Sequence, residues 1–177
     1  MSSHGGYGSA RTLVGSVTEE VVRSVEEPVL VVGSRVAADV SLGDGRIVAC
    51  LDGSAYSGRT LAPAQRWSLA LGLPLWLVLV APAPSPHGAG PGGVRPERRL
   101  AALARSLGGV EGWRVVHDRH PVRALAAMAE DGRVATFVMA THGRTGWPRV
   151  LAGSVTASTV RRATVPVLVV PAGPAAP

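Results

Sequence analysis

The feature that most constrains this chain is an internal repeat. Residues 3–32 align without a gap with residues 141–170, at an offset of 138, and 16 of the 30 paired residues are identical. Random pairing in this composition gives roughly two or three identities, so the two segments share an origin. Both copies contain the run Gly-Ser-Val-Thr and end in Pro-Val-Leu-Val-Val. We therefore expect the end of one unit to precede a whole second copy.

The repeat predicts how the chain is divided. We expect residues 1–33 to be the C-terminal helix and strand of a first domain, 34–45 a linker, and 46–172 a complete domain. The first segment is too short to enclose a core alone, so it must dock on another part of the protein. Residues 1–33 carry two Arg and four Glu (net −2), whereas residues 34–177 carry 16 Arg and eight acidic residues (net +8), which favours this docking. Alternatively, Met1 is a misplaced start within a longer tandem protein.

The order of apolar runs predicts the fold class. Short, continuously apolar runs alternate with helical stretches after residue 45, which is typical of a parallel sheet covered on both faces. We predict a doubly wound, five-stranded α/β domain. Pro63 lies within a predicted helix, which indicates a late start or a kink there. The predicted strands are 29–32, 46–51, 75–80, 113–117, 136–140 and 167–170, and the predicted helices are 16–25, 57–71, 96–107, 121–130 and 154–163.

Composition excludes several classes of protein. All 18 basic residues are arginines, and the absence of lysine excludes a Walker A site and Schiff-base chemistry. The uncharged stretch 67–94 contains only seven clean apolar residues, 75–81, against about 20 needed to cross a bilayer. The one cysteine, Cys50, cannot form an internal disulfide and lies in an apolar strand, and Met1 is not followed by a signal peptide. These features predict a cytoplasmic protein.

Two loops carry the residue types of a ligand site. In an open parallel sheet, ligands bind outside the carboxyl ends of the strands, where the strand order reverses. Asp52 directly follows the strand 46–51, in a position to accept a ribose hydroxyl or hold Mg²⁺. The second loop follows the strand 136–140 and reaches the helix that starts at Ser154, whose unpaired N–H groups attract phosphate. Its other phosphate-directed residues are Gly143, Arg144, Arg149 and Gly153.

At this point the sequence resembles the universal stress protein family. The motifs that carry the resemblance are Ile47–Ser54, Val138–Gly146, Gly153–Thr156 and Pro166–Val170. The resemblance implies an adenine nucleotide alpha hydrolase-like fold with strand order 3-2-1-4-5 and a homodimer formed through the last strand. It also implies, in one branch of the family, binding of ATP.

The ATP-binding branch carries the pattern Gly-x2-Gly-x9-Gly-[Ser/Thr]. This pattern corresponds here to Ala140, Gly143, Gly153 and Ser154, so that Ala140 replaces the first glycine. The resemblance further implies that Asp52 contacts the ribose or the adenine and that the backbone of Val80 borders the adenine. It assigns the phosphates to Thr141, His142, Ser154 and Val155.

The same residues have simpler explanations. Gly143 and Gly153 are also typical turn and helix-entry glycines, Ser154 a helix N-cap, and Asp52 a turn residue. Asp52, His142 and Ser154 suggest a hydrolase triad, but Ser154 lacks the Gly-x-Ser-x-Gly elbow that presents a nucleophilic serine. We therefore predict no catalytic residues.

Two further partners are disfavoured. The isoelectric point near 11 suggests nucleic acid, but the arginines are scattered and the single Phe and two Tyr offer no stacking platform. The histidines lack metal-ligand spacing with any cysteine, so no protein-held metal is expected.

The sequence therefore predicts a regulatory module that binds ATP with Mg²⁺ and shows little or no turnover, because no general base is evident. The alternative is an ATP-independent interaction module that uses the strand Val167–Val170, with the first-copy strand 29–32 available to pair with it.

Overall fold

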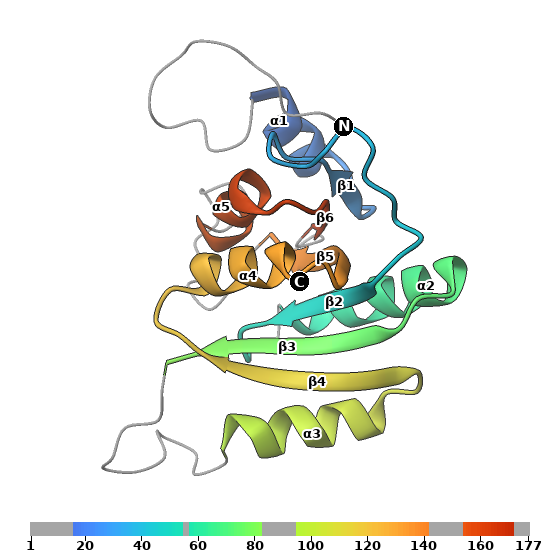
Figure 1. The fold of residues 1–177 in the computed structure, drawn as a ribbon, viewed down its shortest axis with the longest axis vertical. Helices are drawn as coiled ribbons and strands as arrows, with labels where there is room; N and C mark the ends of the chain where they lie inside the picture. The colour runs from blue at the N-terminus through green and yellow to red at the C-terminus, as the bar shows by residue number, and fades with distance from the viewer. Residues whose placement is uncertain (1–15, 55–56, 83–94, 142–153, 172–177) are drawn as a thin grey trace.

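The computed structural model describes residues 16–54, 57–82, 95–141 and 154–171. These residues form a single six-stranded sheet in the order β1-β6-β5-β2-β3-β4 (Figure 1). The five strands β2 to β6 are parallel, and their order is the predicted 3-2-1-4-5. β1 is antiparallel and pairs with the outer edge of β6. The strands are β1 (Val29–Val31), β2 (Arg46–Leu51), β3 (Leu75–Ala81), β4 (Val110–His117), β5 (Val134–Ala140) and β6 (Val167–Val170).

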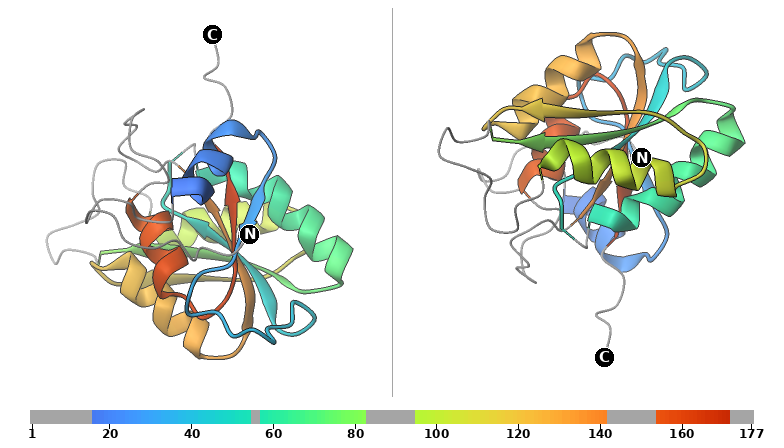
Figure 2. Two further views of the ribbon diagram at one scale, coloured as in Figure 1. Left: turned by 90° about the horizontal axis from the view of Figure 1, so that it is seen from above. Right: turned by 90° about the horizontal axis from the view of Figure 1, so that it is seen from below.

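Helices cover both faces of the sheet (Figure 2). α2 and α3 pack on one face, around a core that includes Leu75, Leu77 and Leu100. α4 and α5 pack on the other, around a second core that includes Phe137 and Leu125 and that α1 joins through Val22. The helical elements are α1 (Ser16–Ser24), η1 (Ser57–Thr60), α2 (Leu61–Leu71), α3 (Pro96–Ser106), α4 (Pro121–Glu130) and α5 (Ser154–Arg162). No helix in the described ranges has the length and apolarity needed to span a membrane.

Two local differences from the expected elements have physical causes. A short 3-10 turn precedes α2, which begins only at Leu61, so Pro63 lies in the first turn, where its missing N–H leaves no helical hydrogen bond unmade. β4 begins at Val110 rather than 113, because Gly112 continues the strand beneath the Trp76 ring. A Cβ on Gly112 would lie 2.6 Å from that ring, so glycine is required by packing. Arg46 covers the same indole, with its guanidinium carbon 4.3 Å from the ring centroid.

Candidate functional site

The candidate site lies at the carboxyl ends of β2 and β5, two neighbouring parallel strands. From β2 the chain crosses to β3 on one side, whereas β5 and β6 lie on the other side. The strand order therefore reverses between β2 and β5, and a crevice is expected outside their carboxyl ends.

The loop after β2 is held in shape by its own side chains. The carboxylate Oδ1 of Asp52 accepts hydrogen bonds from the backbone N–H of Ser54 at 2.9 Å and from its hydroxyl at 2.6 Å. Ser57 extends this network, because its N–H donates to the Ser54 hydroxyl at 3.2 Å. Gly53 has φ of +81°, a conformation that other residues rarely adopt. The chain thus turns sharply after β2, with a carboxylate fixed at the strand end.

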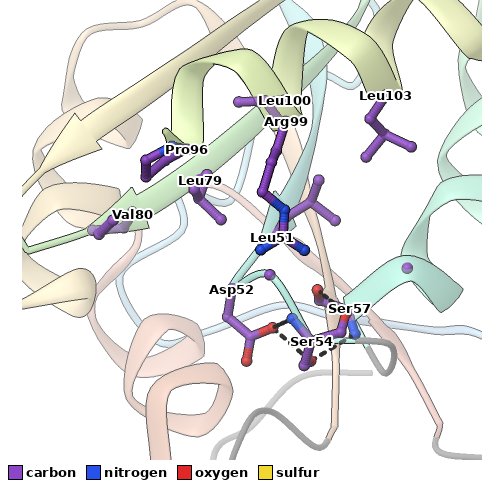
Figure 3. Close-up of a pocket in the computed structure, with 13 residues that line it drawn as sticks. Leu51, Asp52, Ser54, Ser57, Leu79, Val80, Pro96, Arg99, Leu100 and Leu103 are labelled. Atoms are coloured by element: carbon purple, nitrogen blue, oxygen red, sulfur yellow. Dashed lines mark hydrogen bonds between the residues drawn. The ribbon is translucent and has the colours of Figure 1, made fainter. Parts of the chain in front are cut away.

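A pocket of about 370 Å³ opens beside this loop (Figure 3). It lies between the ends of β2 and β3 and the helix α3, which forms the opposite wall. The lining is about half apolar, and its polar groups other than Arg99 belong to the loop of Asp52 and to η1. This volume is within the usual range for small-molecule sites. The pocket is lined by Leu51, Asp52, Gly53, Ser54, Ser57, Gly58, Leu79, Val80, Ala81, Pro96, Arg99, Leu100 and Leu103.

Arg99 is the one basic residue among these lining residues. Its side chain extends from α3 across the pocket, so that the guanidinium points toward the loop of Asp52 (Figure 3). None of the ion pairs between described residues involves Arg99. A guanidinium with this freedom offers donors to an anion or a flat surface to an aromatic ring.

An exposed contact between the side chains of Glu97 and His117 joins α3 to the sheet beside the pocket. Glu97, in the first turn of α3, lies 3.0 Å from Nε2 of His117 at the end of β4. The pKa of Glu97 is lowered, first by a hydrogen bond from its own backbone N–H and then by His117. This contact helps to position the helix face that carries Arg99.

The end of β5 is joined to its neighbours by two hydrogen bonds. The N–H of Thr141 donates to the carbonyl of Val170 at the end of β6, at 2.9 Å. The hydroxyl of Thr156 in α5 donates to the carbonyl of Ala140 at 2.8 Å. The first turn of α5, which contains Ser154 and Val155, therefore lies against the strand end that precedes the second predicted loop.

The structure brings together part of the predicted site. Asp52 and Val80 line one pocket, although they belong to different strands. Ala140 ends the adjacent strand β5, Thr141 follows it, and Ser154 and Val155 begin α5. Ala140, Thr141 and Val155 are not among the described lining residues of the pocket. Five residues predicted to be directed at phosphate lie outside the described residues: His142, Gly143, Arg144, Arg149 and Gly153.

Sequence reasoning missed the wall that α3 supplies. Arg99 and Leu103 are spaced by four residues, so they occupy one helix face, and Pro96 lies one turn before them. That spacing was present in the sequence, but nothing in it indicated that this face borders the loop of Asp52.

Two other predictions concern the reactivity of the cysteine and the binding of a metal ion. Cys50 packs against the core on the α4 and α5 face, and burial raises the pKa of its thiol, which disfavours reactivity at neutral pH. Within the described ranges, no three histidine, cysteine or carboxylate side chains gather in a way that suits a metal ion.

Comparison with known proteins identifies relatives of this fold. Among curated proteins, no relative matches this sequence. A universal stress protein from Archaeoglobus fulgidus DSM 4304 superposes with a TM-score of 0.71 at 26% identity, over 97% of this chain. The chain spans 60% of that structure's length.

Shorter relatives match one domain. A universal stress protein in complex with cAMP has a TM-score of 0.55 at 23% identity, over 72% of this chain and 97% of its own. The Archaeoglobus fulgidus universal stress protein in complex with dAMP gives 0.50 at 20%, over 71% and 97%. The sequence profile described as "Universal stress protein family" matches residues 45–171, well over half of the chain. The chain therefore belongs to the universal stress protein family.

Proposed function

We propose that this chain is a regulatory module that binds ATP with Mg²⁺ at the carboxyl edge of the sheet, with the adenosine in the pocket between β2, β3 and α3 and the phosphates directed toward the end of β5. The observation that carries the proposal is the pocket of about 370 Å³ at this edge, apolar along one wall and bounded by the carboxylate of Asp52. An adenosine needs both an apolar surface for the base and an acceptor for the ribose hydroxyls. The related structures that hold cAMP and dAMP support a nucleotide as the ligand.

Each end of the nucleotide has a proposed set of contacts. The backbone of Val80 borders the adenine, and the carboxylate of Asp52, an acceptor group at the pocket edge, accepts from the ribose hydroxyls. The phosphates extend toward Thr141 and toward the N-terminus of α5 at Ser154 and Val155, where N–H groups and the helix dipole favour negative charge. The proposal assigns the remaining phosphate contacts to His142, Gly143, Arg144 and Gly153.

Arg99 is proposed to cover the face of the base. It extends between the leucines of α3 and the loop of Asp52, on the pocket side that is otherwise apolar. A guanidinium stacked on an aromatic ring contributes about 0.5–2 kcal/mol. Arg98, its exposed neighbour on α3, does not line the pocket and supplies a matched control.

The proposal includes little or no turnover. Among the described lining residues, Asp52 is the one carboxylate and no histidine or cysteine is present, and its Oδ1 accepts two hydrogen bonds from Ser54. The protein would then act through occupancy, as a cytoplasmic stress-response module whose conformation differs between free and ATP-bound states.

Isothermal titration with ATP and Mg²⁺ tests the proposal. We expect binding in the micromolar to low millimolar range, and we expect Asp52→Ala and Arg99→Ala to weaken it while Arg98→Ala leaves it unchanged. Adenosine titrated in parallel separates base contacts from phosphate contacts. Absence of any heat at low millimolar ATP, from a protein that is folded by circular dichroism, would contradict the function.

The second candidate is an ATP-independent interaction module, favoured by the pairing of β6 with β1. The homodimer implied by the family would use the outer edge of β6, Val167–Val170, and β1 covers that edge in this structure. A dimer of that kind thus requires β1 to leave. An oligomeric state that is independent of ATP, in a chain that binds no nucleotide, favours this second candidate.

A further inference from the structure

A second and smaller pocket lies on the face of the sheet that α4 and α5 cover, near the first residues of β2 and β3. Its volume is about 130 Å³, against about 370 Å³ for the pocket beside Asp52. Arg46 begins β2 and Asp52 follows its last residue, so about 20 Å of extended strand separate these two residues. We call this cavity the basic pocket. It is lined by Arg46, Val48, Trp76, Val78, Arg114, Met128, Asp131, Arg133 and Val134.

The inner surface of the basic pocket is apolar. Val48 and Val78 come from neighbouring strands and are at most 1% exposed, and Met128 comes from α4. The residue that pairs with Val78 on β4 is Arg114, whose long side chain is exposed instead of covering the sheet. Apolar side chains therefore line the inside of this cavity without filling it, which leaves a place for a small apolar group.

The outer rim of the basic pocket carries an excess of positive charge. Arg46 comes from β2, Arg114 from β4 and Arg133 from the turn before β5, and Asp131 is the one acidic lining residue. Asp131 lies 3.9 Å from Arg133, and both side chains are largely exposed. Among the ion pairs between described residues, none includes Arg46 or Arg114. An anion bound between these two guanidinium groups would reduce their mutual repulsion.

The guanidinium of Arg46 is held in place by the protein itself. Its Nε donates a hydrogen bond to the carbonyl of Arg133 at 3.2 Å, and its central carbon lies 4.3 Å from the centroid of the Trp76 ring. No hydrogen bond between described residues uses its two Nη groups, which together match the two oxygens of a carboxylate. Because the side chain is already ordered, binding an anion costs less conformational entropy.

An apolar interior beside two guanidinium groups specifies a ligand with both kinds of surface. The volume is below the usual range for nucleotides and other ligands of that size, so the ligand is small. We propose that the basic pocket binds a small carboxylic acid anion that has an apolar or aromatic body. The carboxylate lies between Arg46 and Arg114. The body of the ligand lies against Val78 and Met128. This inference does not depend on nucleotide binding, which concerns the other face and the other end of the sheet.

A titration of the ¹⁵N-labelled full chain, followed by nuclear magnetic resonance, tests the site. The probe is benzoate, compared with benzamide, which has the same ring without the charge, and with acetate, which has the charge without the ring. We expect benzoate to shift the amide signals of Val78 and Arg114 with millimolar saturation, and to leave those of Gly53 and Ser54 beside Asp52 unchanged. Benzamide and acetate should each bind at least about tenfold more weakly.

Three results of this titration would overturn the proposal. The first is the absence of any shift around the basic pocket at saturating benzoate. The second is an equal response to benzamide or acetate, since the site would then not recognise both parts of the ligand. The third is a shift confined to Gly53 and Ser54, which would place the acid in the other pocket.

A matched pair of variants tests the role of the charge. Arg114→Gln removes one guanidinium from the rim of the basic pocket, and Arg119→Gln makes the same change just after β4, at an exposed residue that does not line the pocket. Because both residues are exposed, we expect both variants to fold, which their spectra verify. Arg114→Gln should weaken benzoate binding about fivefold, and Arg119→Gln should leave it unchanged. Equal losses in the two variants, or none in Arg114→Gln, would contradict a defined carboxylate site.

Discussion

The two copies of the repeat fold into the same local elements but occupy different positions in the sheet. Pro-Val-Leu-Val-Val forms β6 in the second copy, where all four strand residues are buried between β5 and β1. In the first copy it forms β1, a three-residue edge strand with only its last residue buried. β6 is parallel to β5, whereas β1 is antiparallel to β6. The repeated sequence therefore determines that a helix and a strand form in each copy. The connections to the rest of the chain determine the direction and the burial of that strand.

The largest difference in unfolding free energy between equivalent substitutions in the two copies is expected at Leu30 and Leu168. Leu168 is fully buried, so Leu168→Ala should cost about 2–5 kcal/mol of unfolding free energy through the cavity it leaves. Leu30 is half-buried at the edge, and Leu30→Ala should cost about 1–2 kcal/mol. Urea denaturation of both variants gives the comparison. Equal losses would show that β1 and β6 contribute equally to one cooperative core.

A smaller loss of stability is expected from a substitution at Gly33, directly after the first copy of the repeat. Gly33→Ala should cost about 1–3 kcal/mol, because a backbone carbonyl, that of Val160, cannot move away as a side chain can. Gly58→Ala is the control, since a Cβ there meets nothing within 4 Å. Thermal unfolding of both variants checks this. A Gly33→Ala protein as stable as the wild type would indicate that the first copy of the repeat is loosely docked against α5.

The smallest effect concerns the two equivalent serines that begin α1 and α5. Ser154→Ala should weaken ATP binding about fivefold, the loss of roughly 1 kcal/mol from one hydrogen bond. Ser16→Ala should leave affinity unchanged, because α1 follows no described strand that neighbours β2. Titration calorimetry distinguishes the two. If Ser16→Ala and Ser154→Ala reduce the affinity for ATP equally, the proposal that only the second copy contacts the phosphates is wrong.

Much of the fold was accessible from the sequence because its signals are local. Continuous apolar runs predicted all five parallel strands, and the family resemblance gave their order. Val110 and Gly112 were excluded from β4, because a strand glycine normally indicates a break, whereas here it makes room for Trp76. The antiparallel direction of β1 had no local signal, since it depends on which edge of the sheet is open.

The candidate site was predictable only in part. Asp52 follows from the rule that ligands bind at the carboxyl ends of parallel strands, whereas Val80 was implied by the family resemblance, and the two residues share the pocket. Arg99 enters from α3, the helix that follows β3, and its position depends on how α3 packs against β4 and β3. No spacing in the sequence encodes that packing angle.

One peptide group connects the carboxyl end of β5 to the strand that β1 covers. The N–H of Thr141, directly after β5, donates to the carbonyl of Val170, and β6 pairs with β1 on its other side. Linkage between the two sites is reciprocal by thermodynamic necessity. A molecule held more tightly by the form in which β1 pairs with β6 must strengthen that pairing by the same factor, so a change in the stability of the pairing upon titration would report binding in the crevice.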